Sequence, residues 1–259
     1  MITESFDNRS EAIIGRALNP DAPKVEACII TFSQVIEKFV VENYDCEQVG
    51  TCYSACGNTP VYVINYRGKR YGFLKSFTGA PACVGTIEDT YDIFYTKKFV
   101  LFGGAGCLNK EIAHGRVMVP TAAYRDEGTS YHYAPASDWI SFPGSGRVAA
   151  FMEDAGLPYV TGKTWTTDAI FRETRGSMEK HKAEGCISVE MESSAVQAMC
   201  DFRGLEFYAF FTSGDLLDAP KWEARREKNQ KKGTQHDPGH FEIALELARY
   251  IAEQGSGQE

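Results

Sequence analysis

The sequence predicts an α/β protein in which a mixed sheet carries helices on both faces. Short apolar runs alternate with amphipathic segments from about residue 26 to the end, an order typical of strands alternating with helices. A chain of 259 residues with 43% hydrophobic and 24% charged residues can bury a core large enough to be stable without disulfides or a structural metal ion. Because no repeat or composition break divides it, we expect one domain over 1–259, with an N-terminal extension at 1–24 and a frayed tail at 255–259.

Local signals place the elements in chain order. Ser33 is a good N-cap for the first helix, and Arg67-Gly68-Lys69-Arg70 between two apolar runs predicts a hairpin. The run Gly103-Gly104-Ala105-Gly106 predicts a turn, Gly204 predicts a helix C-cap, and the Lys-rich segment 225–236 is typical of a mobile surface loop. Strands are expected at 26–31, 61–66, 71–77, 99–102, 116–120, 159–165, 186–189 and 207–212. Helices are expected at 33–41, 81–96, 146–155, 174–184, 193–203 and 238–254.

Charge and cysteine usage exclude several classes of protein. A net charge of −8 argues against a nucleic-acid or membrane-surface partner, because both attract a basic face. The N-terminus carries no signal-peptide pattern, and no apolar stretch is long enough to span a membrane. The eight cysteines include no C-x-x-C pair, so we expect reduced thiols in a cytoplasmic protein. No His, Cys or carboxylate spacing predicts a metal site, and no cofactor is expected.

Two carboxylates stand at the end of the predicted strand 186–189. Glu190 and Glu192 flank Met191 where the helix 193–203 begins. Buried carboxylates require hydrogen-bond donors, and the adjacent hydroxyls of a sugar supply two at once. Acidic side chains also favour a helix N-terminus through its dipole. The spacing alone supports a diol site and a helix-capping pair about equally.

Asp215 follows the apolar run of the next strand. A carboxyl at such a position can have its pKa raised by burial and can act as a general acid. Gly214-Asp215 is also common in turns, and for the isolated pattern the turn is the better interpretation. The glycine run at 103–106 would let main-chain amides approach a ligand closely, although it matches neither the dinucleotide-binding fingerprint nor a P-loop.

Five strings of the sequence carry a joint resemblance to a known family. They are FTGAP (77–81), FGGAGCL (102–108), GRVMVPTAAYRDEG (115–128), TWTTDAIFRET (164–174) and VEMESSAVQAMCDFRGLEFYAFFTSGD (189–215). In this order they resemble the nucleoside phosphorylase superfamily, which contains uridine phosphorylases and hexameric purine nucleoside phosphorylases. The resemblance covers roughly residues 25 to 254 and implies a three-layer α/β/α domain with a mixed, partly barrel-like sheet. It also implies cleavage of a nucleoside and a homo-oligomer, either a dimer or a hexamer.

The resemblance assigns roles to individual residues. It implies that Glu192 accepts the 2′ and 3′ hydroxyls of ribose, that Met191 lines the sugar, with Glu190 nearby, and that Asp215 protonates N7 of a purine. The remaining substrate-binding residues that it implies are Phe171, Arg172, Gly103, Gly104 and Ala105. Phe171 and Arg172 match a base-reading segment of the pyrimidine branch, whereas Asp215 matches the purine branch; we lean towards a purine or modified base.

The sequence departs from the family where phosphate is normally bound. Thr31 replaces a glycine, and Val35 and Leu101 replace two arginines. The position of the family's third arginine, which a neighbouring subunit supplies, falls near Gly57, so this arginine is also missing. Ala105 takes the place of a serine or threonine. The sequence offers Ser33, Lys75, Arg125 and the amides of 103–106 as candidate replacement donors for phosphate, and no pattern singles out one of them.

Three functions therefore stay open. The favoured one is phosphorolysis, with phosphate as co-substrate. The second is hydrolysis by water, for which Glu37 is a poorly aligned candidate base. The third is nucleoside binding without catalysis.

Overall fold

The computed structural model describes residues 1–15, 19–219 and 237–254. The strands are β1 (Cys28–Thr31), β2 (Cys46–Ser54), β3 (Gly57–Tyr66), β4 (Lys69–Lys75), β5 (Lys98–Cys107), β6 (Val117–Asp126), β7 (Trp139–Ser141), β8 (Tyr159–Thr167), β9 (Cys186–Glu190) and β10 (Glu206–Leu216). The α-helices are α1 (Gln34–Asn43), α2 (Ala80–Asp89), α3 (Lys110–Ala113), α4 (Ser130–Tyr133), α5 (Ser145–Asp154), α6 (Arg175–Ala183), α7 (Ser193–Arg203) and α9 (Pro238–Gln254). Single turns of 3₁₀ helix in these ranges are η1 (Ile2–Glu4), η2 (Thr90–Asp92) and η3 (Ile170–Arg172).

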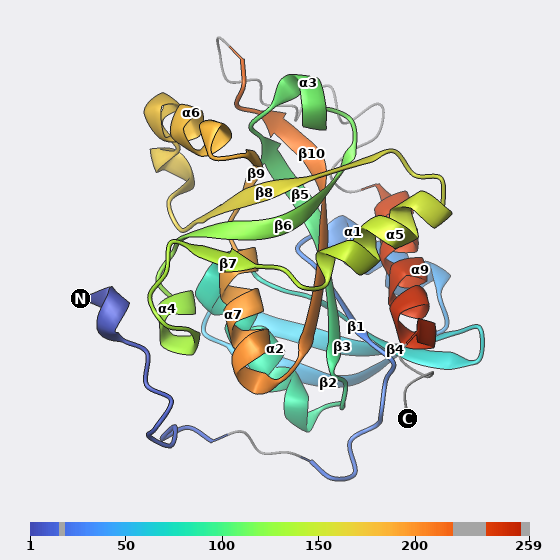
Figure 1. The fold of residues 1–259 in the computed structure, drawn as a ribbon. Coiled ribbons are helices and arrows are strands. Elements are labelled where there is room, and N and C mark those ends of the chain that lie inside the picture. The colour runs from blue at the N-terminus through green and yellow to red at the C-terminus, as the bar shows by residue number, and fades with distance from the viewer. Residues whose placement is uncertain (16–18, 220–236, 255–259) are drawn as a thin grey trace.

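The strands form one mixed sheet, part of which closes into a barrel (Figure 1). Within the described residues the order is β10-β6-β8-β9-β5-β1-β4-β3-β2, and β10 also pairs with β5, so that five strands close on themselves. The strands β6, β8 and β9 run parallel to one another, and β5 runs antiparallel to β9 but parallel to β10. The prediction of a mixed, partly barrel-like sheet is confirmed.

Helices cover the sheet from two sides, as the apolar periodicity predicted. On one side, α2 and α7 bury Val84, Ile87, Val196 and Met199 in a core with residues of β1, β5 and β10. On the other, α1, α5 and α9 form a second core around Phe241, and Figure 1 shows these three helices together at one flank. The apolar side chains of α9 point mostly into this core. Ile243 is only partly covered, whereas Phe241, Leu245, Leu247 and Ile251 are buried.

Several local predictions are confirmed at the level of single hydrogen bonds. The Ser33 hydroxyl caps α1 by accepting from the amide of Ile36 at 3.2 Å. Gly204 ends α7 in the left-handed region, with φ of 67°, a conformation that glycine adopts without strain. The turn Arg67-Gly68 joins β3 to β4 with both residues at positive φ. Each of these features depends on residues that are close in sequence.

Other local predictions are wrong. The glycine run 103–106 is not a turn, because β5 continues through it to Cys107 and pairs with β10 as far as that residue. The helix expected at 81–96 ends at Asp89 and is followed by η2. The strand β2 was not expected, since it is mainly polar, has a single buried residue and lies at the edge of the sheet next to β3, as far as the described residues show. The segment 225–236 and the tail 255–259 lie outside the described residues.

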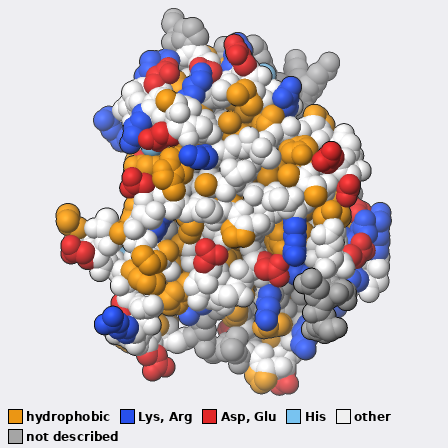
Figure 2. All heavy atoms as spheres, in the orientation of Figure 1, with side chains coloured by type: hydrophobic (Ala, Val, Ile, Leu, Met, Phe, Trp, Pro, Cys, Tyr) orange, Lys and Arg blue, Asp and Glu red, His pale blue; other side chains and the backbone are white. Residues whose placement is uncertain are grey.

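The distribution of surface charge and the state of the cysteines agree with what the composition predicts. In Figure 2, acidic and basic side chains are interspersed over the visible face, with no broad basic area. All eight cysteines are free thiols, and Cys28, Cys83, Cys107, Cys186 and Cys200 are buried. Of the helices in the described ranges, none combines the length and the apolar character needed to cross a bilayer.

Candidate active site

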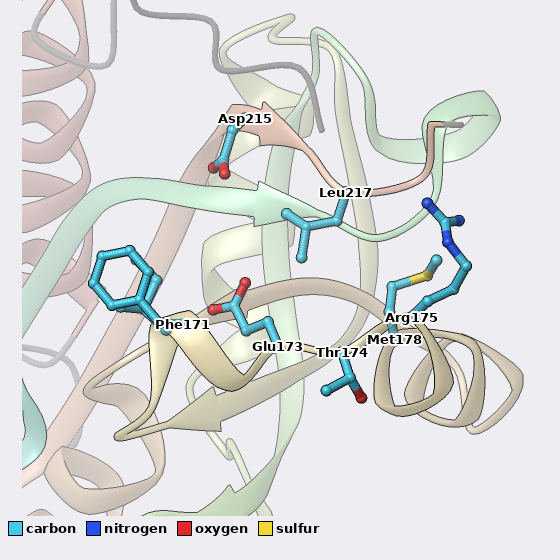
Figure 3. A pocket seen from close by; sticks show the side chains of 8 residues that line it. Phe171, Glu173, Thr174, Arg175, Met178, Asp215 and Leu217 are labelled. Carbon is cyan, nitrogen blue, oxygen red and sulfur yellow. The ribbon is translucent and has the colours of Figure 1, made fainter. Parts of the chain in front are cut away.

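A cavity of about 340 Å³ opens between η3, the start of α6 and the end of β10. Figure 3 shows its lining side chains converging from these elements. Its volume lies within the range usual for small-molecule sites. Two of the predicted site residues, Phe171 and Asp215, line it. The complete lining is Ile170, Phe171, Glu173, Thr174, Arg175, Met178, Asp215 and Leu217.

Asp215 is positioned by an irregularity at the end of β10. The register of β10 against β5 shifts between Ser213 and Leu216, and the half-buried Asp215 lies within this shift. Its Oδ1 would be 3.7 Å from a Cβ atom added at Gly106. The same added atom would lie 2.7 Å from Val189 Cγ1, so the lack of a side chain at Gly106 allows β9, β5 and β10 to approach one another here.

Glu173 faces Asp215 across the cavity (Figure 3). It follows η3 and precedes Thr174, whose hydroxyl caps α6 by accepting from the amide of Ser177 at 3.2 Å. Burial, and then the negative charge of Asp215, raise the pKa of Glu173 to about 7. Within the described ranges no hydrogen bond or cation acts in the opposite direction. Near neutral pH the Glu173 carboxyl is therefore close to half protonated.

Glu190 anchors the start of α7. One of its oxygens, Oε2, accepts from the amides of Glu192 and Ser193 at 2.9 and 2.7 Å and from the Ser193 hydroxyl at 2.8 Å. The other accepts from the Thr166 hydroxyl at 2.5 Å. The helix-capping interpretation of the sequence thus describes Glu190 well, and its contact with a substrate stays a prediction.

Glu192 is buried with fewer hydrogen-bond donors than Glu190. Only 4% of its surface is exposed, and it accepts from the amide of Gly79 at 2.6 Å and from its neighbour Met191 at 3.3 Å. Burial, followed by the charge of Glu190, raises the pKa of Glu192 to about 8. No Lys, Arg or His in the described part of the chain offsets these effects. This carboxyl therefore has unused acceptor capacity and no counter-ion there.

Glu192 does not line the cavity that holds Asp215, but one short segment connects their surroundings. The charge of Asp168 acts on Glu192, whereas Phe171 and Glu173, a few residues later, line the cavity with Asp215. The segment between β8 and α6 thus reaches both carboxyls. Phe171 is 96% exposed and forms an open wall of the cavity.

The other predicted site residues do not line the cavity. Arg172 is exposed, and Met191 is half-buried. Gly103, Gly104 and Ala105 lie within β5, where they pair with Phe211, Thr212 and Ser213 of β10. Their contact with a substrate also stays a prediction.

The positions expected to bind phosphate are engaged in other contacts. Leu101 is fully buried in a hydrophobic core, and the Thr31 hydroxyl accepts from the amide of Ser33 at 3.3 Å. Arg125 is buried and donates to the Ser130 hydroxyl at 2.9 Å and to the carbonyl oxygen of Pro135 at 2.7 Å. The Lys75 ammonium lies 5.2 Å from the centre of the Phe77 ring.

Sequence reasoning missed most of the cavity wall. Glu173 and Thr174 end the matching string 164–174, and Arg175 and Met178 belong to the helix expected from 174, but neither signal assigned these residues to a site. Gly79 belongs to the matching string FTGAP (77–81), but its hydrogen bond to Glu192 joins residues 113 positions apart. Within the described ranges, no group of three or more His, Cys, Asp or Glu side chains could hold a metal ion.

Comparison with known proteins gives consistent results. The sequence profile of the phosphorylase superfamily matches residues 32–240. A uridine phosphorylase of Salmonella typhimurium is 28% identical over 204 residues, which cover 71% of this chain and 77% of that protein. A DeoD-type purine nucleoside phosphorylase of Alkaliphilus metalliredigens is 23% identical, with 82% and 89% of the two chains covered. The crystal structure of an AMP nucleosidase from Bacteroides thetaiotaomicron has the same fold, with a TM-score of 0.66, 17% identity and coverage of 90% and 91%.

Proposed function

Because the chain belongs to the phosphorylase superfamily, we propose that it cleaves the N-glycosidic bond of a nucleoside and that water is the acceptor. The observation that carries this proposal is the buried Glu192 carboxyl, which has two amide donors and no counter-ion among the described residues. A ligand that brings several hydroxyl donors to this carboxyl would stabilise it, and a ribose diol does so.

The sugar is held by Glu192 in this proposal. Each carboxylate oxygen accepts one main-chain amide and can accept at least one further hydrogen bond. The 2′ and 3′ hydroxyls lie on adjacent carbons and can donate to the two oxygens together. The bond to Gly79 sets the direction of the carboxylate before substrate arrives, so binding loses little side-chain entropy.

The base occupies the cavity beside Asp215. Phe171, Met178 and Leu217 provide apolar surface for a flat ring, and Asp215 donates a proton to the ring as the C1′–N bond breaks. The electron pair of that bond stays with the base, and the sugar becomes cation-like at C1′. Water then adds to C1′ and releases a proton to solvent, from which Asp215 is reprotonated.

Water is favoured over phosphate by the charges around the site. Glu173, Asp215, Glu190 and Glu192 are all acidic, and a doubly charged phosphate taken from solvent would be repelled by those that are ionised. Leu101, at a position where the family has an arginine, is fully buried. Arg125 already uses its guanidinium on Ser130, Ala134 and Pro135. A neutral acceptor avoids these electrostatic costs.

Product analysis tests both parts of the proposal. A panel of nucleosides is incubated with and without phosphate, and the sugar product is identified. Free ribose, formed at the same rate in both conditions, is the expected result. Ribose 1-phosphate formed only with phosphate would overturn the choice of water, and binding without turnover would overturn catalysis.

Two variants test the site itself. Glu192→Gln should lose more than about 2 kcal/mol of transition-state stabilisation, roughly 30-fold in kcat/KM. Asp215→Asn should lower kcat by at least about 100-fold. Glu179→Gln, an exposed carboxylate of α6 outside the cavity, is the matched control and should behave as wild type. Near-normal kcat/KM in Glu192→Gln would contradict the assignment of the sugar site.

A further inference from the structure

We propose that Glu173 is a specificity-determining residue that, together with Asp215, selects 6-aminopurine nucleosides over 6-oxopurine nucleosides. This inference rests on the proposed function, because it concerns the base that the cavity holds. The two carboxyls come from different parts of the chain, Glu173 from the link between η3 and α6 and Asp215 from β10. Figure 3 shows them extending into the same space from opposite walls.

The walls between the two carboxyls are apolar. Phe171 and Leu217 flank the pair in Figure 3, and Ile170 and Met178 complete this surface. A flat heterocycle fits between such walls, with its ring faces against apolar atoms and its polar edge towards the carboxyls. The apolar walls thus bind the faces of the ring, and the two carboxyls recognise its polar edge.

The charged groups around Glu173 lie on three elements. Asp215 of β10 faces it directly. Arg175 of α6 also lines the cavity, but its guanidinium donates to the carbonyl oxygen of Ala219 at 2.8 Å and lies beyond Met178 in Figure 3. Arg172 of η3 is exposed and does not line the cavity. The ionisation of Glu173 is therefore governed mainly by burial and by Asp215.

Glu173 changes its hydrogen-bonding role near neutral pH. Burial and the charge of Asp215 raise the pKa of Glu173 to about 7, so this carboxyl carries a proton below that pH and is ionised above it. The protonated carboxyl can donate a hydrogen bond to a bound base, whereas the ionised carboxylate can only accept one.

Purines differ in whether the group next to N7 donates or accepts a hydrogen bond. In a 6-aminopurine, N7 is an acceptor and the adjacent amino group is a donor. This edge is complementary to an ionised Glu173, which accepts from the amine, and to Asp215 in its proposed role as the donor to N7. A 6-oxopurine presents two acceptors, N7 and O6, and needs a proton on Glu173 as well. Glu173 thus favours the amino base whenever it is ionised.

The test compares kcat/KM for adenosine and inosine between pH 5.5 and 8.5. In the wild type the ratio should be at least roughly 10-fold in favour of adenosine above pH 7, the effect of one well-formed hydrogen bond, and should fall below pH 6. In Glu173→Gln the ratio should fall by about 10-fold and lose its pH dependence, because an amide offers a donor and an acceptor at every pH. Glu179→Gln, the matched control on α6, should retain the wild-type ratio and profile.

Unchanged ratio and pH profile in Glu173→Gln would overturn the inference, as would a preference for uridine over adenosine in the wild type. Calorimetry with the free bases adenine and hypoxanthine separates this result from failure of the proposed function. If no nucleoside is cleaved but adenine binds more tightly than hypoxanthine only when Glu173 is present, the proposed catalysis fails and the base-reading role stands. If cleavage occurs and the substitution of Glu173 changes neither selectivity nor base binding, the base-reading role fails alone.

Discussion

The main-chain amide of Gly79 donates a 2.6 Å hydrogen bond to Oε1 of Glu192, joining residues 113 positions apart. Gly79 has φ of +107° and precedes α2, whereas Glu192 precedes α7. The two helix starts are thereby held together at the buried carboxyl. Other residues adopt this conformation only with strain. The position of the amide that donates to Glu192 therefore depends on glycine at residue 79.

The substitution Gly79→Ala should therefore affect both stability and sugar binding. The strained φ should lower the free energy of unfolding by about 1–3 kcal/mol, and displacement of the amide should raise KM for nucleosides. Urea unfolding and steady-state kinetics measure the two effects. Gly85→Ala, within α2 and with open space around an added Cβ atom, is the control and should be neutral or slightly stabilising. A Gly79→Ala protein with wild-type stability and KM would contradict this account.

Burial of Glu192 should make the unfolding free energy depend on pH. The pKa of Glu192 is about 8 in the folded state, against 4.5 for an ordinary glutamate, so the folded state binds an extra proton between these two pH values. The associated stability is fully present below pH 4.5 and is lost as the pH rises towards 8 and beyond. Glu192→Gln removes this proton and should flatten the curve in that window, by an amount on the order of several kcal/mol. Denaturant titrations from pH 5 to 9 measure it, and parallel wild-type and variant curves would be the contrary result.

The two glutamates should respond differently to the same substitution. Glu190→Gln can keep an oxygen towards the amides of Glu192 and Ser193 while its new amide donates to Thr166, so stability and kcat/KM should change little. Glu190→Ala leaves buried donors unpaired and should cost about 2–4 kcal/mol of unfolding free energy. Glu192→Gln, in contrast, should mainly lower activity. Equal losses of activity in Glu190→Gln and Glu192→Gln would show that Glu190 is more than a helix cap.

The close approach of three strands at Gly106 gives a fourth prediction. In Gly106→Ala the added Cβ atom would lie 2.7 Å from both Val189 Cγ1 and Leu217 Cδ1 and next to Asp215. Overpacking of this kind should cost about 1–3 kcal/mol, and the shift of Asp215 should lower kcat more than KM. Gly146→Ala in α5, where an added Cβ atom meets nothing within 4 Å, should leave kcat unchanged. Wild-type kcat in Gly106→Ala would contradict the proposed packing.

Much of the fold could be predicted from short-range chemistry. The helix at 193–203 and its end at Gly204 agree with the structure residue by residue, and so do the bounds of the helix at 238–254. A cap, a tight turn or an amphipathic stripe involves neighbours in the chain, so its signal is visible in a short window. The glycine run at 103–106 misled this reasoning, because a strand paired on both sides can override a local preference for turns.

The sequence by itself determined that acidic side chains stand at residues 190, 192 and 215, just where apolar runs end, and that the chain resembles nucleoside-cleaving enzymes. Only the tertiary structure decided their different environments. The Thr166 hydroxyl donates a hydrogen bond to Glu190, the Gly79 amide donates one to Glu192, and Glu173 faces Asp215. The physical reason is that the ionisation and hydrogen bonding of a buried carboxyl depend on the groups within a few ångströms of it. The groups that distinguish the three carboxyls here, Thr166, Gly79 and Glu173, are distant in sequence from the carboxyls that they contact or face.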